Sequence, residues 1–236
     1  MPPRESLGRI LDSGAAEIGI PLSPAQQRLL ERYVALIVEW NQRLRLSGMH
    51  TPADVAHILV LGALEVLPFL PEAGSVLDLG SGAGVPGIPV AVMRPGARVV
   101  LAEAARRKAA FLELAVRDLG LANVAVLNVR AEALGRAPEH REQYDVVAAR
   151  ALAPLRVLAE YALPLLRIGG VGVFPKGAGA ADEIAAAAHV LRLLGGRAET
   201  RPSLSRHAWT TVLMWKVAPT PLEYPRRPGV PSRRPL

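Results

Sequence analysis

The sequence has no cysteine among its 236 residues, and its five histidines form no H-E-x-x-H or comparable cluster. The lack of cysteine excludes a disulfide framework, a thiolate metal site and a cysteine nucleophile. The lack of a histidine motif leaves no metal site to predict. A cysteine-free chain fits a reducing cytosol, and we expect a cytoplasmic monomer that holds no metal.

Long apolar runs are also scarce. The first twenty residues, MPPRESLGRILDSGAAEIGI, lack the apolar core of a signal peptide. The most apolar run extends from Ile58 to Leu70, but it carries Glu65 and is too short to span a bilayer. We therefore expect a buried helix in this run and no membrane attachment.

Positive charge is in excess, with a net charge of +7 and a sequence pI of about 10.5. Such an excess favours a polyanionic partner. Residues 219–236 hold four arginines and six prolines against one acid. Because proline interrupts helices and central strands, we predict an extended arm that contacts RNA; a frayed chain end is the alternative. The arginines of this arm are Arg226, Arg227, Arg233 and Arg234.

Residues 1–70 are predicted to form an N-terminal helical segment. Ser23-Pro24-Ala25-Gln26 combines a capping residue, a proline at the first helical position and a glutamine at the third, which together begin a helix. Apolar residues from Leu29 to Leu44 then recur at helical spacing, so this helix should bury one face. Residues 71–218 would form the main domain, followed by the arm.

From Ser75 onward, short β-rich runs alternate with helical stretches. This alternation predicts an α/β fold with a mostly parallel sheet covered on both faces. The expected strands are SVLDL, RVVLAE, VAVLNV, YDVVAA and GVGVF, with helices over 86–94, 105–119, 154–166 and 180–194. RAETR and AWTTVLMWKV then follow one another without a helix, which indicates an antiparallel pair at one edge.

A glycine-rich loop, VLDLGSGAGVPGIP, follows the first of these strands. It contains a literal G-x-G-x-x-G from Gly82, which taken alone suggests a dinucleotide site. A dinucleotide strand should be apolar to its end, however, and Asp78 and Gly80 interrupt it. The register D-x-G-x-G-x-G, beginning at Asp78, fits better. In that register the glycines allow a ligand to approach the backbone closely.

Ligands of open parallel sheets bind beyond the carboxyl ends of the strands. At those positions Glu103 is placed to accept both hydroxyls of a ribose, and Glu132 or the adjacent backbone N–H to face an adenine edge. Asp78 would orient the loop or meet an ammonium group. Arg150 ends the fourth strand, where it would orient a cofactor or a target base or form a strand-end ion pair.

The stretches VLDLGSGAGVPGIPVAVMRPGARVVLAEAARRKAAFL, NVRAEAL, YDVVAARALAPL and YPRRPGVPSRRPL resemble the small-subunit ribosomal RNA guanine-N7 methyltransferases, also called glucose-inhibited division protein B. The resemblance implies a Rossmann-like class I methyltransferase fold that uses S-adenosylmethionine, with ribosomal RNA or the small ribosomal subunit as partner. Where this family has a histidine followed closely by Asp-Ser, the chain has His57-Ile58-Leu59. The cofactor-site residues implied are Gly80, Gly82, Val85, Glu103, Ala104, Ala105, Ala131, Glu132 and Arg150.

The residues after the fourth strand bear on the nucleophile. Enzymes that methylate exocyclic amines place an (Asn/Asp)-Pro-Pro-aromatic clamp there, whereas this chain has Ala149-Arg150-Ala151-Leu152-Ala153-Pro154. Methylation of a pyrimidine C5 needs a cysteine nucleophile, which is absent. Both absences suit a nucleophile with a free lone pair, such as guanine N7. Positioning would then carry most of the rate, and we expect no dedicated general base. Lys176 is expected on the ligand side, against the guanine or a phosphate, or else as a solvated turn residue.

We therefore predict methylation of a guanine N7 in 16S ribosomal RNA, with Arg150 as the tentative catalytic residue. The alternatives are a methyltransferase for another RNA or a small molecule, a nicotinamide oxidoreductase, and an RNA-binding protein with a vestigial loop. The glycine register disfavours the oxidoreductase. Arg106-Arg107-Lys108 and the basic arm favour RNA over a small molecule.

Overall fold

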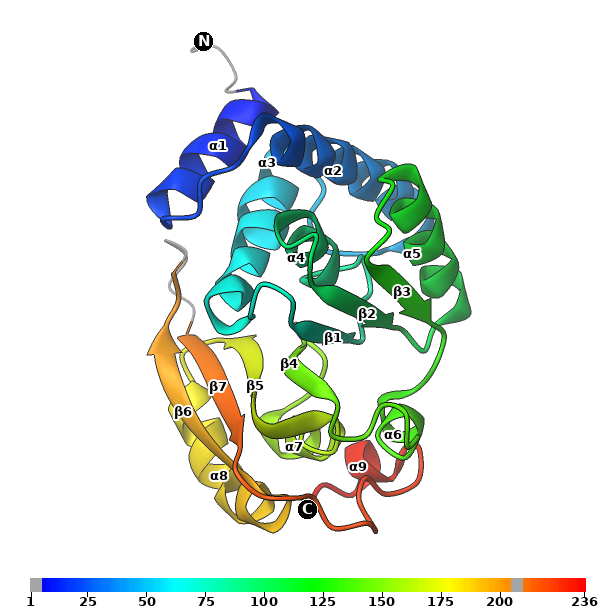
Figure 1. Cartoon of the computed structure of the whole chain (residues 1–236), viewed down its shortest axis with the longest axis vertical. Helices are drawn as coiled ribbons and strands as arrows, with labels where there is room; N and C mark the ends of the chain where they lie inside the picture. Colours follow the sequence, from blue (N-terminus) through cyan, green and yellow to red (C-terminus); the bar gives the residue numbers. More distant parts are fainter. Residues whose placement is uncertain (1–5, 205–209) are drawn as a thin grey trace.

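The computed structural model describes residues 6–204 and 210–236. Within these ranges, seven strands form one sheet in the order β3-β2-β1-β4-β5-β7-β6 (Figure 1). Strands β1 to β5 pair in parallel, and β7 is antiparallel to both β5 and β6. Their bounds are β1 Ser75–Leu79, β2 Arg98–Ala102, β3 Val124–Leu127, β4 Tyr144–Ala148, β5 Leu166–Lys176, β6 Gly196–Pro202 and β7 Thr210–Lys216.

This sheet confirms the predicted mostly parallel α/β fold with an antiparallel edge. The main difference is β5, which begins at Leu166 and is longer than the predicted GVGVF. Residues 208 and 209 of the last predicted strand, and residues 1–5 of the predicted N-terminal segment, lie outside the described residues.

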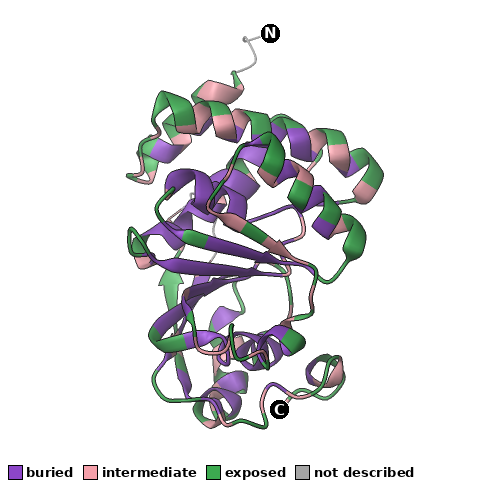
Figure 2. Cartoon of the chain, turned by 45° about the vertical axis from the view of Figure 1, so that its right-hand side comes forward, coloured by how far each residue is buried: buried purple, intermediate pink, exposed green. Residues whose placement is uncertain are grey.

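Helices cover both faces of the sheet, and strand alternation divides the core between them. In β1, Val76 packs with α4 (Gly87–Met93) and α5 (Arg106–Asp118) on one face. Leu77 and Leu79 pack on the opposite face with α7 (Leu155–Ala162) and α8 (Ala180–Leu193). Figure 2 shows the central strands buried and the outer helix surfaces exposed. Two one-turn helices, α6 (Ala131–Leu134) and α9 (Val230–Arg233), complete the second face.

The N-terminal helices share the core of the first face. They are α1 (Leu7–Glu17), α2 (Pro24–Leu44), α3 (Pro52–Asp54), a π-helical turn η1 (Val55–Leu61) and a 3-10 helix η2 (Leu64–Phe69). The predicted capping box is present, because Ser23 and Gln26 each accept the other's backbone N–H. Tyr33 of α2 is fully buried, and its hydroxyl donates to the carbonyl of Ala83 in the glycine loop at 2.8 Å. The boundaries at residues 70 and 218 stay predictions, since this layer and the sheet form one core.

The apolar run predicted as a buried helix lies in this layer. Pro52–Phe69, with 18 residues and a mean hydropathy of 1.5, is long and apolar enough to cross a membrane by length and composition. In the protein, 56% of this stretch is buried, with contacts to α1, α2 and α4. Its apolar character is accounted for by packing inside the molecule.

The prediction of an extended arm over residues 219–236 is wrong. The segment folds back onto α7 and contains α9, in which Pro231 is tolerated because it lies in the first turn. Six of its residues are prolines, which have no backbone N–H to donate to a neighbouring strand. Carbonyl oxygens of the segment accept hydrogen bonds from side chains instead. The Arg141 guanidinium donates to the carbonyls of Thr220 and Tyr224 at 2.7 and 2.8 Å.

We expect Tyr33→Phe to lower the free energy of unfolding by about 1 to 2 kcal/mol, because the buried Ala83 carbonyl loses its donor. Urea denaturation measures this change. Tyr224→Phe is the matched control, since the Tyr224 hydroxyl has no hydrogen bond among the described residues. Equal stability of the two variants would show that the link between α2 and the loop is unimportant.

Candidate functional site

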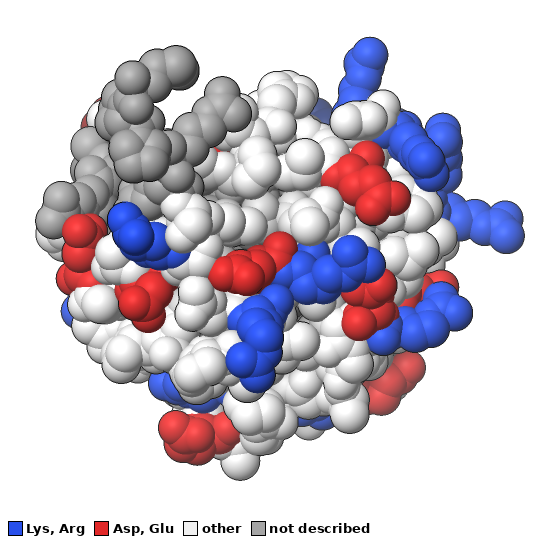
Figure 3. Space-filling view, turned by 90° about the horizontal axis from the view of Figure 1, so that it is seen from above, with Lys and Arg blue, Asp and Glu red and all other residues white. Residues whose placement is uncertain are grey.

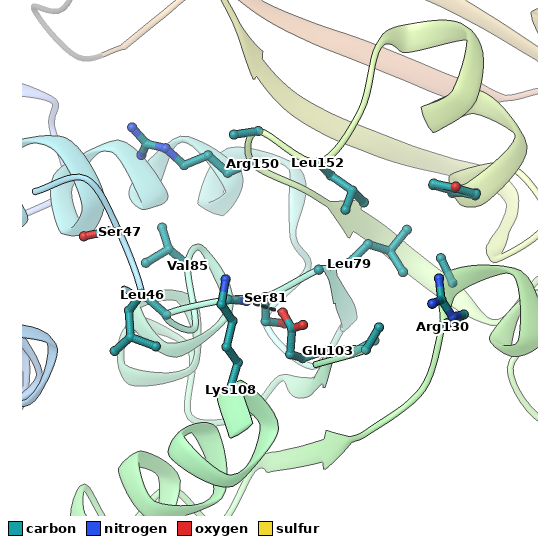
Figure 4. Close-up of a pocket in the computed structure, with 18 of the residues that line it drawn as sticks. Leu46, Ser47, Leu79, Ser81, Val85, Glu103, Lys108, Arg130, Arg150 and Leu152 are labelled. Carbon is teal, nitrogen blue, oxygen red and sulfur yellow. Dashed lines mark hydrogen bonds between the residues drawn. The ribbon is translucent and has the colours of Figure 1, made fainter. Parts of the chain in front are cut away.

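A pocket of about 600 Å³ lies at the carboxyl edge of the parallel strands (Figure 4). Volumes of this size are typical of small-molecule sites. Its walls come from the loops after β1, β2, β3 and β4, and from the loop after α2. The lining residues used below are Leu46, Ser47, Gly48, Met49, Gly80, Gly82, Val85, Glu103, Ala104, Lys108, Arg130, Ala131, Glu132, Arg150, Leu152 and Tyr161.

The glycine loop forms the floor of this pocket. Gly82 has φ +56°, a left-handed conformation that glycine adopts without strain. A Cβ at Gly82 would meet nothing closer than the Gly80 carbonyl oxygen at 3.7 Å. Open space therefore lies where a side chain would project. The backbone N–H groups of Gly80 and Ser81 donate to the Ala102 carbonyl, which anchors the loop to β2.

Asp78 holds this loop from below. Its side chain is fully buried, and Oδ2 accepts the N–H of Gly87, the first residue of α4, at 2.9 Å. Its Oδ1 has no hydrogen-bond partner among the described residues. Burial raises the pKa of Asp78 to about 7, against the hydrogen bonds from Gly87 and Ser81 and with a smaller contribution from the charge of Glu103. The position agrees with the predicted loop-orienting role.

Glu103 joins two parts of the pocket wall. Its Oε2 accepts the N–H of Gly82 at 2.9 Å, and its Oε1 accepts the N–H of Ala105 at 2.7 Å. Each carboxylate oxygen keeps acceptor capacity beyond these bonds. A carboxylate held in this way can accept the two neighbouring hydroxyls of a ribose.

Arg150 lies at the mouth of the pocket, on the chain that leaves β4. Its Nη1 donates to the carbonyl of Ile58 in η1 at 2.5 Å, and Figure 4 shows the guanidinium reaching toward that helix. Burial lowers its pKa, and the charge of Glu65 opposes this shift. The next residue, Ala151, has φ +51°, so the chain turns sharply there. The turn brings Leu152 over Gly80, where a Cβ would lie 2.6 Å from Leu152 Cδ1.

Glu132 closes the far side of the pocket. It is the second residue of α6, and it is 3% exposed. One carboxylate oxygen accepts the N–H of Gly229 from the C-terminal segment at 2.7 Å. Ala131 and Ala104 line the pocket as predicted, whereas Ala105 contributes through its N–H to Glu103.

Sequence reasoning missed several lining residues. The loop Leu46–Met49 comes from the N-terminal helical segment, and Tyr161 is the penultimate residue of α7. Neither follows a strand, so the rule about strand ends could not find them. Lys108 and Arg130 were adjacent to recognised positions, and Figure 4 shows Lys108 extending from α5 toward Ser81 and Glu103.

Lys176 requires a correction. It does not line the pocket; its Nζ donates to Glu183 at 2.8 Å and to the Ala153 carbonyl at 3.0 Å. Glu183 in turn accepts the N–H of Leu155 at 2.8 Å. Lys176 therefore supports the loop that carries Arg150, and its contact with a guanine or a phosphate stays a prediction.

The predicted RNA contacts of the arm also change. The guanidinium of Arg226, which is partly exposed, is paired with buried Glu160 at 2.7 Å. Arg227, Arg233 and Arg234 are exposed, and RNA binding by these three stays a prediction.

Cationic side chains also lie on other faces. Figure 3 shows Lys and Arg projecting along the edge where Figure 1 places α2 and α5, with acidic side chains among them. One such pair, Arg32 with Asp118, joins α2 to α5 through two 2.8 Å bonds. Positive charge is therefore not confined to the C-terminal segment. Among the residues that the structure describes, no group of three or more potential ligands could hold a metal ion.

The chain is similar over most of its length to known proteins. A family model, GidB, described as rRNA small subunit methyltransferase G, matches residues 26–211. The Ribosomal RNA small subunit methyltransferase G of Pelotomaculum thermopropionicum is 41% identical, over 98% of this chain and 99% of that protein. The protein of the same name from a Roseiflexus species is 43% identical, over 92% and 95% of the two chains.

Solved structures support the fold. A tRNA methyltransferase from Aquifex aeolicus superposes with a TM-score of 0.51 over 66% of this chain and 68% of its own, at 17% identity. At that identity the likeness concerns the fold alone.

Asp78→Asn should make stability less dependent on pH. Because the pKa of Asp78 is raised from 3.8 to about 7, the folded state retains a proton that the unfolded chain releases between those values. Wild-type stability should therefore fall as pH rises through this window and level off above it. Asparagine keeps the acceptor for Gly87 without titrating. Urea midpoints at pH 5, 6, 7 and 8 test this, and parallel curves for both proteins would contradict it.

Proposed function

We propose that this chain, which belongs to the GidB family of rRNA small subunit methyltransferases G, transfers the methyl group of S-adenosylmethionine to a guanine N7 of 16S ribosomal RNA. The observation that carries the proposal is the Glu103 carboxylate, fixed across the glycine loop at the pocket floor. The fold, the pocket and the family point to the same reaction.

The residues of the pocket fit S-adenosylmethionine. Gly82 leaves open space above the loop, and Glu103 offers a carboxylate for the ribose hydroxyls. Ala131 and Glu132 line the side predicted for the adenine. The Asp78 side chain is fully buried and accepts the N–H of Gly87. Asp78 therefore positions the loop that would bind the cofactor and does not contact the cofactor itself.

When bound, the cofactor supplies an electrophilic methyl group on a sulfonium. A guanine N7 has a free lone pair and carries no proton that would have to be removed. The protein therefore needs no general base, and its task is to align the base in line with the methyl group. Arg150 and Leu152 lie at the mouth of the pocket, where they can orient a guanine by hydrogen bonding and by apolar contact.

We further propose that the protein works as a cytoplasmic monomer, without membrane attachment, on ribosomal RNA or the small subunit. The buried state of Pro52–Phe69 supports the absence of a membrane anchor. The relatives' names favour ribosomal RNA over another RNA or a small molecule.

Gly82→Val should abolish binding of S-adenosylmethionine, because a branched side chain at φ +56° would occupy the pocket and strain the loop. Calorimetry measures this, with NAD as the ligand that wild type should not bind. Gly120→Val is the matched control: its φ is +64°, and no atom lies within 4 Å of its Cβ position.

The reaction itself is tested by mapping 7-methylguanine in 16S ribosomal RNA from a strain lacking the gene. Wild type and Gly120→Val should restore the modification, and Gly82→Val should not. A deletion strain with an unchanged methylation map would refute the proposed function.

Arg150→Lys should reduce kcat/KM by about tenfold, because lysine keeps the charge but loses the planar set of donors that reaches Ile58 and the pocket. Steady-state methylation of 16S ribosomal RNA measures it. Arg197→Lys, an exposed position on β6, is the control. Wild-type activity in Arg150→Lys would show that the geometry of this residue is not needed.

A further inference from the structure

The C-terminal segment, residues 219–236, is held against the rest of the protein by two arginine side chains that come shortly before β4 in the sequence. Arg136 donates to the carbonyl of Pro225 at 2.7 Å, and Arg141 to those of Thr220 and Tyr224. Figure 1 shows the segment ending beside α6 and α7. These anchors bring its last third next to the pocket wall.

An ion pair fixes the segment to α7. Glu160 is fully buried, and its two carboxylate oxygens accept the backbone N–H, Nε and Nη2 of Arg226, at distances from 2.7 to 3.2 Å. Loss of this partner would leave a buried charge uncompensated and destabilise the folded protein, so the pair favours docking of the segment at this place.

Beyond this pair, the segment is linked to two residues that line the pocket. The N–H of Gly229 donates to Glu132 at 2.7 Å, and Tyr161 directly follows Glu160, the residue that binds Arg226. Glu132 and Tyr161 are 3% and 8% exposed. The segment does not itself line the pocket. It supports, from behind, the wall opposite the glycine loop.

We propose that the C-terminal segment is a backing wall for the cofactor pocket, and that Arg226 and Gly229 are positioning residues that set the affinity for S-adenosylmethionine through Glu132 and Tyr161. This inference rests on the proposed function. A side chain held in its bound position loses less conformational freedom when the ligand arrives, so the contacts raise affinity without touching the ligand.

The charges of the segment agree with this division of roles. Arg226 forms an ion pair with Glu160, whereas Arg227 and Arg234 are exposed. Cofactor affinity and RNA affinity should therefore depend on different arginines of the same segment. Substitutions can separate them.

Glu160→Gln is the first test, because glutamine keeps the size and one acceptor oxygen but removes the charge that holds Arg226. We expect the Kd for S-adenosylmethionine, measured by calorimetry, to rise about five- to tenfold. With saturating cofactor, kcat and the KM for ribosomal RNA should stay within about twofold of wild type. A merely structural role would lower the Tm without this split between cofactor affinity and turnover.

Gly229→Ala is a second variant that leaves the buried pair intact. At φ +81° an added Cβ is strained and would lie 2.8 Å from Nη2 of Arg233, so the turn that presents the Gly229 N–H should shift. The same rise in the Kd for S-adenosylmethionine is expected, with little change in Tm.

The matched control is the double variant Arg227→Ala/Arg234→Ala, which removes two charges from the segment but neither anchor. Its Kd for S-adenosylmethionine should stay within about twofold of wild type. The inference is overturned if Glu160→Gln and Gly229→Ala fold and bind the cofactor like wild type, or if the control weakens binding equally. A wild-type protein that binds no S-adenosylmethionine would instead refute the proposed function.

Discussion

The hydrogen bond between Asp78 and the Gly87 N–H is the constraint on which the site depends. It joins the end of β1 to the beginning of α4, so the loop between them is fixed at both ends. A Cβ at Gly87 would lie 2.1 Å from Leu101 Cδ2 and 3.0 Å from Asp78 Oδ2, so only glycine permits this approach. The strand, the helix and the loop are thereby built around one buried carboxylate. The cost of that arrangement is a raised pKa and an Oδ1 that has no hydrogen-bond partner among the described residues.

The same loop is supported from three further directions. Tyr33 reaches it from α2, Ala102 from β2, and Glu103 through the N–H of Gly82. The N-terminal helices are therefore part of the site and not an appendage to it. Preorganisation of this kind suits a reaction that depends on the alignment of the reacting atoms.

Much of this arrangement could be predicted because it is encoded locally. Ser23-Pro24 begins α2 by a capping box, the apolar runs alternate with helices, and Glu103 is recognisable because it directly follows a strand. The docking of the C-terminal segment could not be predicted, since it depends on Arg141 and Glu160, which lie far away in the sequence. Prolines excluded a long helix there but said nothing about side chains that bind the carbonyls. Lys176 failed for a similar reason, because its partner Glu183 is specified by packing.

The position of the N-terminal layer has a consequence for synthesis. Ribosomes deliver α1 and α2 first, but α2 packs against α4 and α5, which follow later. A nascent chain that has reached only Phe69 therefore presents an unpaired amphipathic layer together with an apolar stretch of 18 residues. Such an intermediate exposes apolar surface that the complete protein buries.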